Sequence, residues 1–313
     1  MQLQNLILPL CIAARALAQQ NIDLTRSMCA FVFEMGFTPN CQILQFEGAV
    51  VAAAKASMGP LKQFFVSPNI RGNGAWTEQY DDGHWLVQWH ESGIYWDLFY
   101  QYMQYSGDTT HLSFVDKNIQ TASIGGDFLD GANPFLELAG RWNDDIAWWG
   151  ITAARATQIF GQKAVVASDN IQAGFNPTYF TLANATFYQV FNQWDNLCGG
   201  GIYWSRTRAE GTADPTLKST ITNVEEMEIA AKLYSVTKDA DFKTKFDQIF
   251  AWLKSSGIIA GDYVVYDGIR TGGCAISPNI YSYYYGELFA ALGEMYTLTK
   301  QQSYLDEGNK LFT

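Results

Sequence analysis

The sequence predicts an all-α protein built as a stacked or toroidal array of helical hairpins. A helix–turn–helix pattern recurs along the chain, and several long segments are apolar on most of their helical faces. Strand-like patterns are confined to short loop segments. Because no Pro/Ser-rich linker or abrupt change in composition interrupts the chain, we expect one domain over residues 19–313.

The recurring pattern marks the turns between helices. An apolar run ends in an aromatic residue or leucine, glycine or lysine closes the helix, and a small polar residue caps the next helix. The clear copies lie at 102–110, 233–240 and 295–302. A looser copy lies at 157–162, and 56–60 is a candidate for the first turn.

The helices predicted to be buried occupy the runs between these turns. Helices that are apolar on nearly every face are typical of the inner ring of a double-layered toroid. The runs with this character are 85–105, 146–160, 224–237 and 281–299. Segments 200–206 and 258–266 are predicted to form small hairpins at one mouth of the array.

Charge and composition exclude several classes of partner. The chain has 20 Lys and Arg against 31 Asp and Glu, a net charge of −11, which argues against nucleic acids and anionic membranes. Only 3 histidines are present, so a metal centre built from several histidines has little to draw on. No cofactor is expected. The 10 Trp and 17 Tyr suit a cleft that stacks on a sugar, although a bulky aromatic core gives the same count.

The amino terminus indicates export. Residues 1–18 hold a short apolar run followed by Ala16-Leu17-Ala18, which is typical of a signal peptide and its cleavage site; a mispredicted start or a buried helix is the alternative. Asn184 begins a glycosylation sequon. No later apolar run is long enough to span a membrane. We therefore expect a secreted or cell-wall protein that acts as a monomer.

Cysteine usage agrees with export. Removal of the leader also removes Cys11, and an even number of cysteines remains, which permits two disulfides. The remaining cysteines are Cys29, Cys41, Cys198 and Cys274. The pairing Cys29–Cys41 with Cys198–Cys274 is favoured, and the other two pairings stay open. The three glycines after Cys198 indicate close packing beside a disulfide.

The pair Asp144-Asp145 is the candidate catalytic centre. Asn143 and Asp144 are favoured at helix N-caps and the chain is helical from Ile146 onward, so the pair is predicted at a helix N-terminus. The non-helical backbone of a cap would let the two carboxyls diverge around a shared space. Carboxylates about 5 Å apart suit retaining glycoside hydrolysis. The alternative is a plain cap with an exposed acidic neighbour.

Around this pair the sequence resembles glycoside hydrolase family 76, the α-1,6-mannanases and their fungal cell-wall relatives. The family's N-D-D followed by an aromatic pair is matched by Asn143-Asp144-Asp145 and Trp148-Trp149. Further matches follow in order over roughly 80–300. They are Trp89-His90-Glu91 with Trp96, Cys198-Gly199-Gly200-Gly201 with Trp204, Ile221-Thr222-Asn223, and Tyr283 with Gly286.

The resemblance implies an (α/α)6 barrel that cleaves α-1,6-mannan with retention, without a metal. Asp144 would be the nucleophile and Asp145 the acid/base. By position, the substrate-binding candidates are Trp89, Glu91, Asn143, Trp149, Trp204, Asn223 and Tyr283.

Some positions depart from the family pattern. Tyr284 replaces an asparagine, Val224 a glycine, and His90 the second aromatic residue of W-W-E. The chain also ends soon after its fifth predicted turn, so we expect either a truncated sequence or a barrel that lacks its last hairpin. Two alternatives to hydrolysis therefore stay open: a cell-wall transglycosylase acting on mannose-containing glycans, and an inactive glycan-binding relative.

Overall fold

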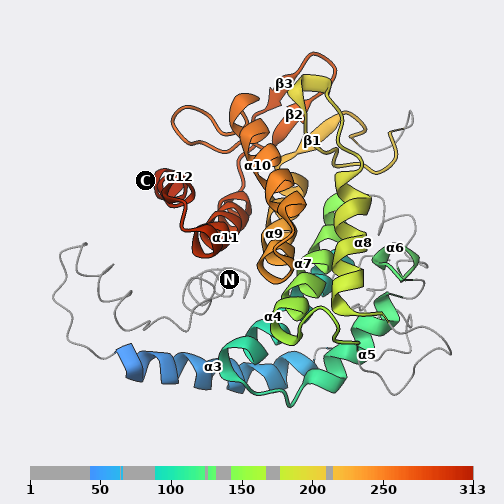
Figure 1. The fold of residues 1–313 in the computed structure, drawn as a ribbon, viewed down its shortest axis with the longest axis vertical. Helices are drawn as coiled ribbons and strands as arrows, with labels where there is room; N and C mark the ends of the chain where they lie inside the picture. Colours follow the sequence, from blue (N-terminus) through green and yellow to red (C-terminus); the bar gives the residue numbers. More distant parts are fainter. Residues whose placement is uncertain are drawn as a thin grey trace, which may run out of the picture.

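The computed structural model describes residues 43–63, 65, 89–123, 126–131, 142–166, 177–208 and 214–312 (Figure 1). The predicted leader and Cys29 and Cys41 lie outside the described residues. The described part is helical apart from three short strands, which confirms the all-α prediction.

Four helices form the inner layer: α4 (Trp89–Ser106), α7 (Asn143–Phe160), α9 (Thr220–Thr237) and α11 (Ser282–Thr299). Each contacts the next in chain order. They correspond to the four runs predicted to be buried. In α9 the residues from Thr220 through Leu233 are all buried, as expected for a helix with apolar neighbours on every side.

Contacts between the inner helices show that they run in the same direction. The hydroxyl of Thr152 in α7 donates to the carbonyl of Gly93 in α4 at 2.7 Å, and three residues later Arg155 contacts Asp97, four residues further along α4. Between α9 and α11, Lys232 donates to Glu294 at 2.8 Å. The first turns of the inner helices therefore gather at one end of the molecule.

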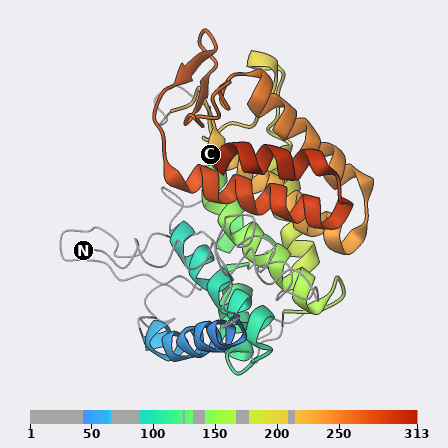
Figure 2. The same cartoon turned by 90° about the vertical axis from the view of Figure 1, so that its left-hand side faces the viewer.

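Each inner helix is followed by an outer helix that packs back on it. The outer helices are α5 (Leu112–Ala122), α8 (Tyr179–Phe191), α10 (Ala240–Ser255) and α12 (Gln302–Phe312), and α11 and α12 lie side by side in Figure 2. Helix α3 (Ile43–Gln63) packs on α4, and the short α6 (Phe128–Gly131) packs on α5 and α7. The described residues thus supply four successive hairpins of a helical toroid, while closure with six stays a prediction.

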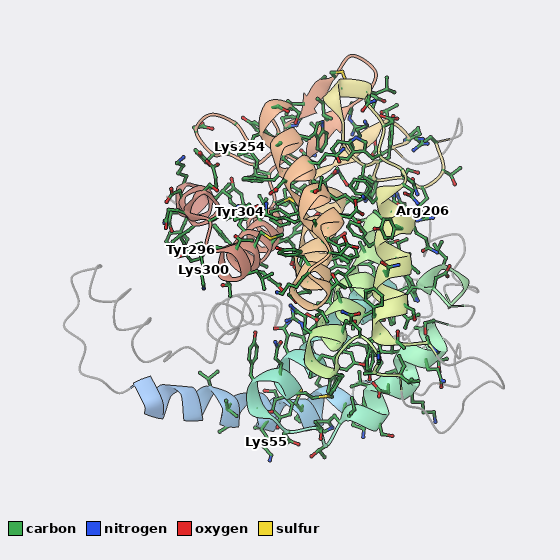
Figure 3. The ribbon with its side chains drawn as sticks, in the orientation of Figure 1. Lys55, Arg206, Lys254, Tyr296, Lys300 and Tyr304 are labelled. Atoms are coloured by element: carbon green, nitrogen blue, oxygen red, sulfur yellow. A yellow bond between two sulfur atoms is a disulfide. The ribbon has the colours of Figure 1, made fainter. Side chains whose placement is uncertain are left out.

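Side-chain contacts join the outer helices α10 and α12, whose Lys254 and Tyr304 are labelled in Figure 3. Lys254 of α10 pairs with Glu307 of α12 at 2.7 Å, and the hydroxyl of Tyr304 donates to Asp247 at 2.5 Å. Phe246 of α10 also meets the ring of Tyr304 edge-on, at 5.6 Å between centroids. Neighbouring hairpins are therefore joined in the outer layer as well as in the inner one.

Most of the predicted turns are confirmed. Lys238 and Lys300 close α9 and α11 in the left-handed conformation with φ of 58°, and α4 ends at Ser106, inside the first predicted turn. The turn predicted at 56–60 is wrong, because α3 continues through Pro60 to Gln63. Pro60 removes one i→i−4 hydrogen bond, yet α3 extends over residues 61–63 after it, so a single proline did not end this helix.

The two ends of the toroid differ in the length of their connections. At the end where the inner helices finish, residues 107–111, 238–239 and 300–301 make short links, and only 161–178 is longer. At the end where they begin, the links are 123–142, 192–219 and 256–281. The longer links lie beside the first turns of α7, α9 and α11.

A small antiparallel sheet stands at the end where α9 begins. Strands β1 (Leu217–Ser219), β2 (Gly268–Arg270) and β3 (Ala275–Ser277) pair in that order. The strands predicted within 200–206 and 258–266 are wrong in position: these segments contribute isolated bridges only. Strands of three residues are too short for the period-two alternation that marks a strand.

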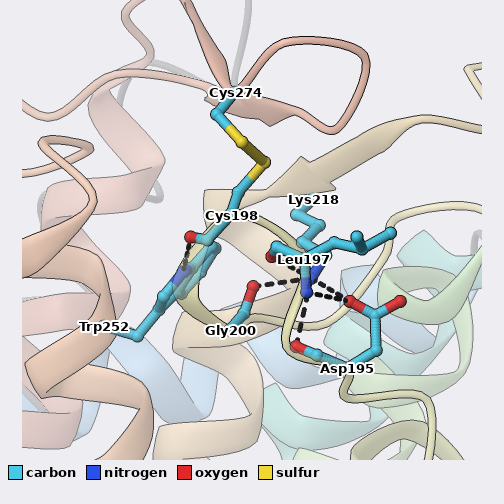
Figure 4. Close-up of a disulfide and its surroundings, with 7 residues drawn as sticks. All are labelled: Asp195, Leu197, Cys198, Gly200, Lys218, Trp252 and Cys274. Carbon is cyan, nitrogen blue, oxygen red and sulfur yellow. Dashed lines mark hydrogen bonds and ion pairs between the residues drawn. A yellow bond between two sulfur atoms is a disulfide. The ribbon is translucent and has the colours of Figure 1, made fainter.

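The loop before β1 is held by a disulfide and a buried lysine (Figure 4). Cys198, in the short helix η1 (Leu197–Gly199), is bonded to Cys274 with 5.4 Å between Cα atoms, which confirms this predicted pairing. The ammonium of Lys218 donates to the carbonyls of Leu197 and Gly200 at 2.8 and 2.6 Å and to Asp195. The loop backbone is therefore fixed from two sides.

The glycines after Cys198 pack closely, as predicted. A Cβ on Gly201 would lie 2.3 Å from ring carbons of Trp252. That indole donates to the carbonyl of Cys198 at 3.2 Å, so the ring is held against the loop (Figure 4). Within the described ranges, no helix is long and apolar enough to cross a membrane.

Candidate active site

Asp144 and Asp145 lie in the first turn of α7. The helix begins at Asn143, and the extended residue before it, Trp142, is the N-cap with φ −113° and ψ 147°. The prediction that Asn143 or Asp144 caps the helix is therefore wrong. Both aspartates have helical backbone, so their side chains leave the helix about 100° apart around its axis.

Asn143 uses its side chain to tie the start of α7 to the loop that follows η1. Its amide nitrogen donates to the carbonyl of Tyr203 at 2.7 Å, and its oxygen accepts from Arg206 at 2.9 Å. The amides of Asn143 and Gln193 also bond reciprocally at 3.0 and 3.1 Å. These bonds compete with capping, which explains why Asn143 is not the cap. They fix the two residues that follow it.

The surroundings of Asp144 supply hydrogen bonds to only part of its carboxyl group. Burial raises its pKa to about 6, and hydrogen bonding from the Trp204 indole and from the N–H groups at the helix start limits the rise. Its Oδ1 atom is buried without a hydrogen-bond partner. Asp144 is thus ionised above about pH 6, and one of its carboxyl oxygens makes no hydrogen bond within the described protein.

Asp145 has a different electrostatic environment. Burial raises its pKa well above the ordinary range, and the neighbouring charge of Asp144 raises it further. The Nδ1 atom of His90, on α4, lies 3.3 Å from its Oδ1. Two adjacent carboxyls therefore have pKa values raised by different causes, burial alone for Asp144 and burial with the charge of Asp144 for Asp145.

A glutamate that sequence reasoning missed, Glu225, lies near this pair, and a second, Glu287, lies near Glu225. Glu225 of α9 is fully buried with no hydrogen-bond partner on either carboxyl oxygen. Its pKa is raised by burial first, then by the charges of Asp144 and of Glu287 in α11. A buried carboxylate costs free energy to ionise. A glutamate within a run predicted to be buried could therefore have been noticed in the sequence as a candidate functional residue.

Several of the predicted substrate-binding residues are buried and bonded to neighbouring parts of the protein. Trp89 and Trp149 are buried with ring centroids 5.0 Å apart, and the Trp149 indole donates to the Trp89 carbonyl at 3.2 Å. Asn223 is also buried. Its side chain bonds the N–H and carbonyl of Ile202 at 3.0 Å each and the carbonyl of Ser219 at 2.7 Å. Direct contact of these residues with a ligand stays a prediction.

Other predicted residues keep part of their surface in solvent. Trp204 is half-buried and stacks on Trp142 with ring centroids 5.2 Å apart. Glu91 is half-buried in the first turn of α4, and Tyr283 is half-buried in that of α11. Burial raises the pKa of Tyr283, and Asp144 is among the charges that raise it further. Trp204 and Tyr283 therefore both lie close to Asp144. Trp204 lowers the pKa of Asp144, and the charge of Asp144 raises the pKa of Tyr283.

The residues that depart from the resemblance have structural partners here. Tyr284 is buried and its hydroxyl donates to Asp267, while Val224 is fully buried in α9. Asn184 of the predicted sequon is half-buried in α8, and the buried hydroxyl of Thr186 donates to the carbonyl of Leu182 at 2.9 Å. Glycosylation of Asn184 stays a prediction. In the part of the chain that the structure describes, no three acidic, His or Cys side chains are grouped to hold a metal ion.

Comparison with known proteins identifies a family and a set of relatives. The family model for glycosyl hydrolase family 76 matches residues 49–313. A putative mannan endo-1,6-α-mannosidase of Schizosaccharomyces pombe is 27% identical over 216 residues, which cover 67% of this chain and 46% of that protein. The mannan endo-1,6-α-mannosidase DCW1 of Saccharomyces cerevisiae is 26% identical, covering 67% and 45%. The chain thus spans about half the length of these curated relatives.

Solved structures share the fold. Dfg5 of Chaetomium thermophilum, in complex with glucosamine, matches with a TM-score of 0.66 at 21% identity, covering 84% of this chain and 62% of that chain. The GH76A α-1,6-mannanase of Salegentibacter sp. matches with a TM-score of 0.63 at 18% identity. The match covers 83% of this chain and 68% of that chain. An inactive variant of that mannanase, with two successive aspartates replaced by asparagine, was solved with α-1,6-mannotriose; it matches with 0.62 at 17% identity, covering 83% and 68%.

Proposed function

Because this chain belongs to glycosyl hydrolase family 76, we propose that it is a retaining endo-α-1,6-mannosidase that hydrolyses α-1,6-mannan. The observation that carries the proposal is the pair Asp144-Asp145, two neighbouring carboxyls whose pKa values are raised to different extents. Retaining glycosidases need one ionised and one protonated carboxyl beside the scissile bond.

Asp144 is the nucleophile in this proposal. Its pKa of about 6 keeps it ionised at neutral pH, and its Oδ1 has no hydrogen-bond partner to displace before attack. The carboxylate bonds to the anomeric carbon as the bond to the leaving oxygen breaks, which gives a mannosyl-enzyme ester. The N-terminus of α7 favours the ionised form of Asp144 before attack.

Asp145 is the acid/base. Its raised pKa keeps the proton on the carboxyl until the leaving oxygen takes it. The resulting carboxylate then removes a proton from the water that attacks the mannosyl ester, which restores both aspartates. Trp204 and Tyr283, both half-buried, supply aromatic surface for the sugar rings next to the cleavage point.

The comparisons support this substrate class. Curated relatives carry the name mannan endo-1,6-α-mannosidase, and a solved mannanase lost activity when two successive aspartates were replaced. The disulfide Cys198–Cys274 agrees with action outside the cell or in the cell wall, where disulfides persist. We propose that the chain acts there as a monomer without a cofactor.

The test measures hydrolysis of linear α-1,6-mannan by the wild type, Asp144→Asn and Asp145→Asn. Both variants should lose at least about 10³-fold in kcat/KM and remain folded. Asp262→Asn, an exposed loop substitution, is the matched control and should keep wild-type activity. If either site variant kept near-wild-type turnover, the catalytic assignment would be wrong.

Product analysis distinguishes the alternatives. NMR of the first product should show the α-anomer, which establishes retention. An added acceptor sugar that receives most of the mannosyl groups would identify a transglycosylase. Binding of mannan by the wild type without turnover would identify a glycan-binding relative.

A further inference from the structure

His90 stands next to the proposed acid/base from a neighbouring helix. It is the second residue of α4, and its Nδ1 atom lies 3.3 Å from Oδ1 of Asp145 in α7. About a third of the His90 side chain is exposed, at 34%, against 10% for Asp145. The imidazole therefore reaches from the solvent side to the more buried carboxyl.

Helix packing fixes this approach. Trp89, the residue before His90, is buried against Trp149 with 5.0 Å between ring centroids. Gly93, three residues after His90, leaves room for the Trp149 backbone and ring, since a Cβ there would meet them at 3.1 Å. The start of α4 is thus held against the first turns of α7, which keeps the backbone of His90 beside Asp145.

We propose that His90 is a positioning residue that holds Oδ1 of Asp145 through Nδ1 and stabilises the anionic form of that carboxyl. This rests on the proposed role of Asp145 as the acid/base. With Oδ1 held by the imidazole, Oδ2 carries the proton for the leaving oxygen. When that proton leaves, the electron pair of the O–H bond stays on Asp145, and the N–H at Nδ1 donates to the new carboxylate.

The imidazole suits this role because it is uncharged. Burial lowers the pKa of His90 to about 4, so the ring is neutral at neutral pH. A neutral ring with its proton on Nδ1 donates to the carboxylate without adding a fixed positive charge. A hydrogen bond to a charged acceptor is stronger than one to the neutral acid, so His90 lowers the pKa of Asp145 from the value that its other neighbours set.

Those neighbours are acidic on every side. Asp144 lies on the same helix, Glu225 faces the pair from α9, and Glu287 of α11 lies near Glu225. Tyr283 of α11 is close enough to feel the charge of Asp144. The charge of Asp144 makes the anion of Asp145 harder to form, and so would a charge on Glu225, although the second half of the reaction requires that anion. His90 is the neighbour that opposes them.

The first test compares pH profiles of kcat/KM on α-1,6-mannan for His90→Phe and His90→Asn. Phe removes the donor, so the alkaline pKa of the profile should rise by about one unit and kcat should fall about tenfold. The side-chain nitrogen of Asn is two bonds from Cβ, like Nδ1 of His, and carries N–H donors. His90→Asn should therefore restore the wild-type alkaline limb of the pH profile. A His90→Phe profile that overlays the wild type would overturn the proposal, as would a His90→Asn profile that matches His90→Phe.

The second test uses no substrate, so it separates this proposal from the proposed function. The chain has only 3 histidines, so ¹⁵N-histidine NMR of the full-length protein can be assigned from single variants. His90 should carry its proton on Nδ1 in the wild type and lose that preference in Asp145→Asn. His111→Gln serves as the control, because His111 packs on Phe99 in the first hairpin and should leave the His90 signals unchanged. A proton on Nε2 that is indifferent to Asp145→Asn would refute the contact even in an active enzyme.

Discussion

Gly201 and Gly199 make a matched pair for testing how tightly the loop behind the site is packed. Both have positive φ, of 92° and 80°, which L side chains rarely adopt. A Cβ on Gly199 would meet nothing within 4 Å, whereas one on Gly201 would meet three ring carbons of Trp252 at 2.3, 2.3 and 2.6 Å. The two alanine variants therefore share the backbone strain and differ in the steric conflict.

The magnitude follows from the position of the ring. Trp252 is 3% exposed and bonded to the Cys198 carbonyl, so it has no open space to enter. Carbon atoms prefer about 3.5 to 4.0 Å, so the ring would need to withdraw by more than about 1 Å. Backbone strain costs about 1 to 2 kcal/mol in both variants, and overpacking adds about 1 to 3 in Gly201→Ala.

The assay is guanidinium unfolding with the disulfide intact, followed by tryptophan fluorescence. Gly199→Ala should lower the free energy of unfolding by about 1 to 2 kcal/mol, and Gly201→Ala by about 2 to 5 kcal/mol. Losses that agree within about 0.5 kcal/mol would refute the packing argument and leave backbone strain as the whole effect.

Further predictions concern protonation and the disulfide. Since the pKa of Asp144 is raised to about 6, kcat/KM should fall as pH drops through about 6 and this proposed nucleophile becomes protonated. An acid limb near 4 in the pH–rate profile would contradict this. Glu226 is fully buried without a partner on either oxygen, and burial raises its pKa well above the ordinary range, so its contribution to stability is present at low pH and declines as pH rises. Glu226→Leu should therefore stabilise the protein by about 1 to 3 kcal/mol at pH 8 and little at pH 4, measured by chemical unfolding; equal effects at both values would argue against a buried charge. Replacing Cys198 and Cys274 together by serine opens a link across 76 residues and should cost about 2 to 5 kcal/mol in the same assay, and a midpoint unchanged from that of the oxidised wild type would contradict it.

Most of the fold could be predicted from local sequence patterns. The turns around Lys238 and Lys300 were predictable because the end of a helix and the cap of the next are written in adjacent residues. The buried helices were predictable because an inner-ring helix needs apolar side chains on most faces. Strand β2 was not predictable, since it pairs on one side with β1 from a distant part of the chain and its three residues show no period.

The candidate site also has features that local sequence predicts and features that depend on tertiary contacts. Asp144 and Asp145 could be chosen from their neighbours in sequence, because a helix start gives acidic residues a recognisable place. The cap was misplaced because the bonds of Asn143 to Tyr203 and Arg206 come from a loop some sixty residues away. The approach of His90 to Asp145 is likewise a tertiary contact, and nothing local to either residue encodes it.

The unequal connections at the two ends of the toroid also bear on how such a protein can change over evolution. The brief links at 238–239 and 300–301 leave almost no room for insertion without separating a hairpin, so the frame tolerates little change there. The extended links 192–219 and 256–281 can gain or lose residues while the helices they join stay packed. The loops at the end where the inner helices begin can therefore change in sequence and length while the packed helices stay the same.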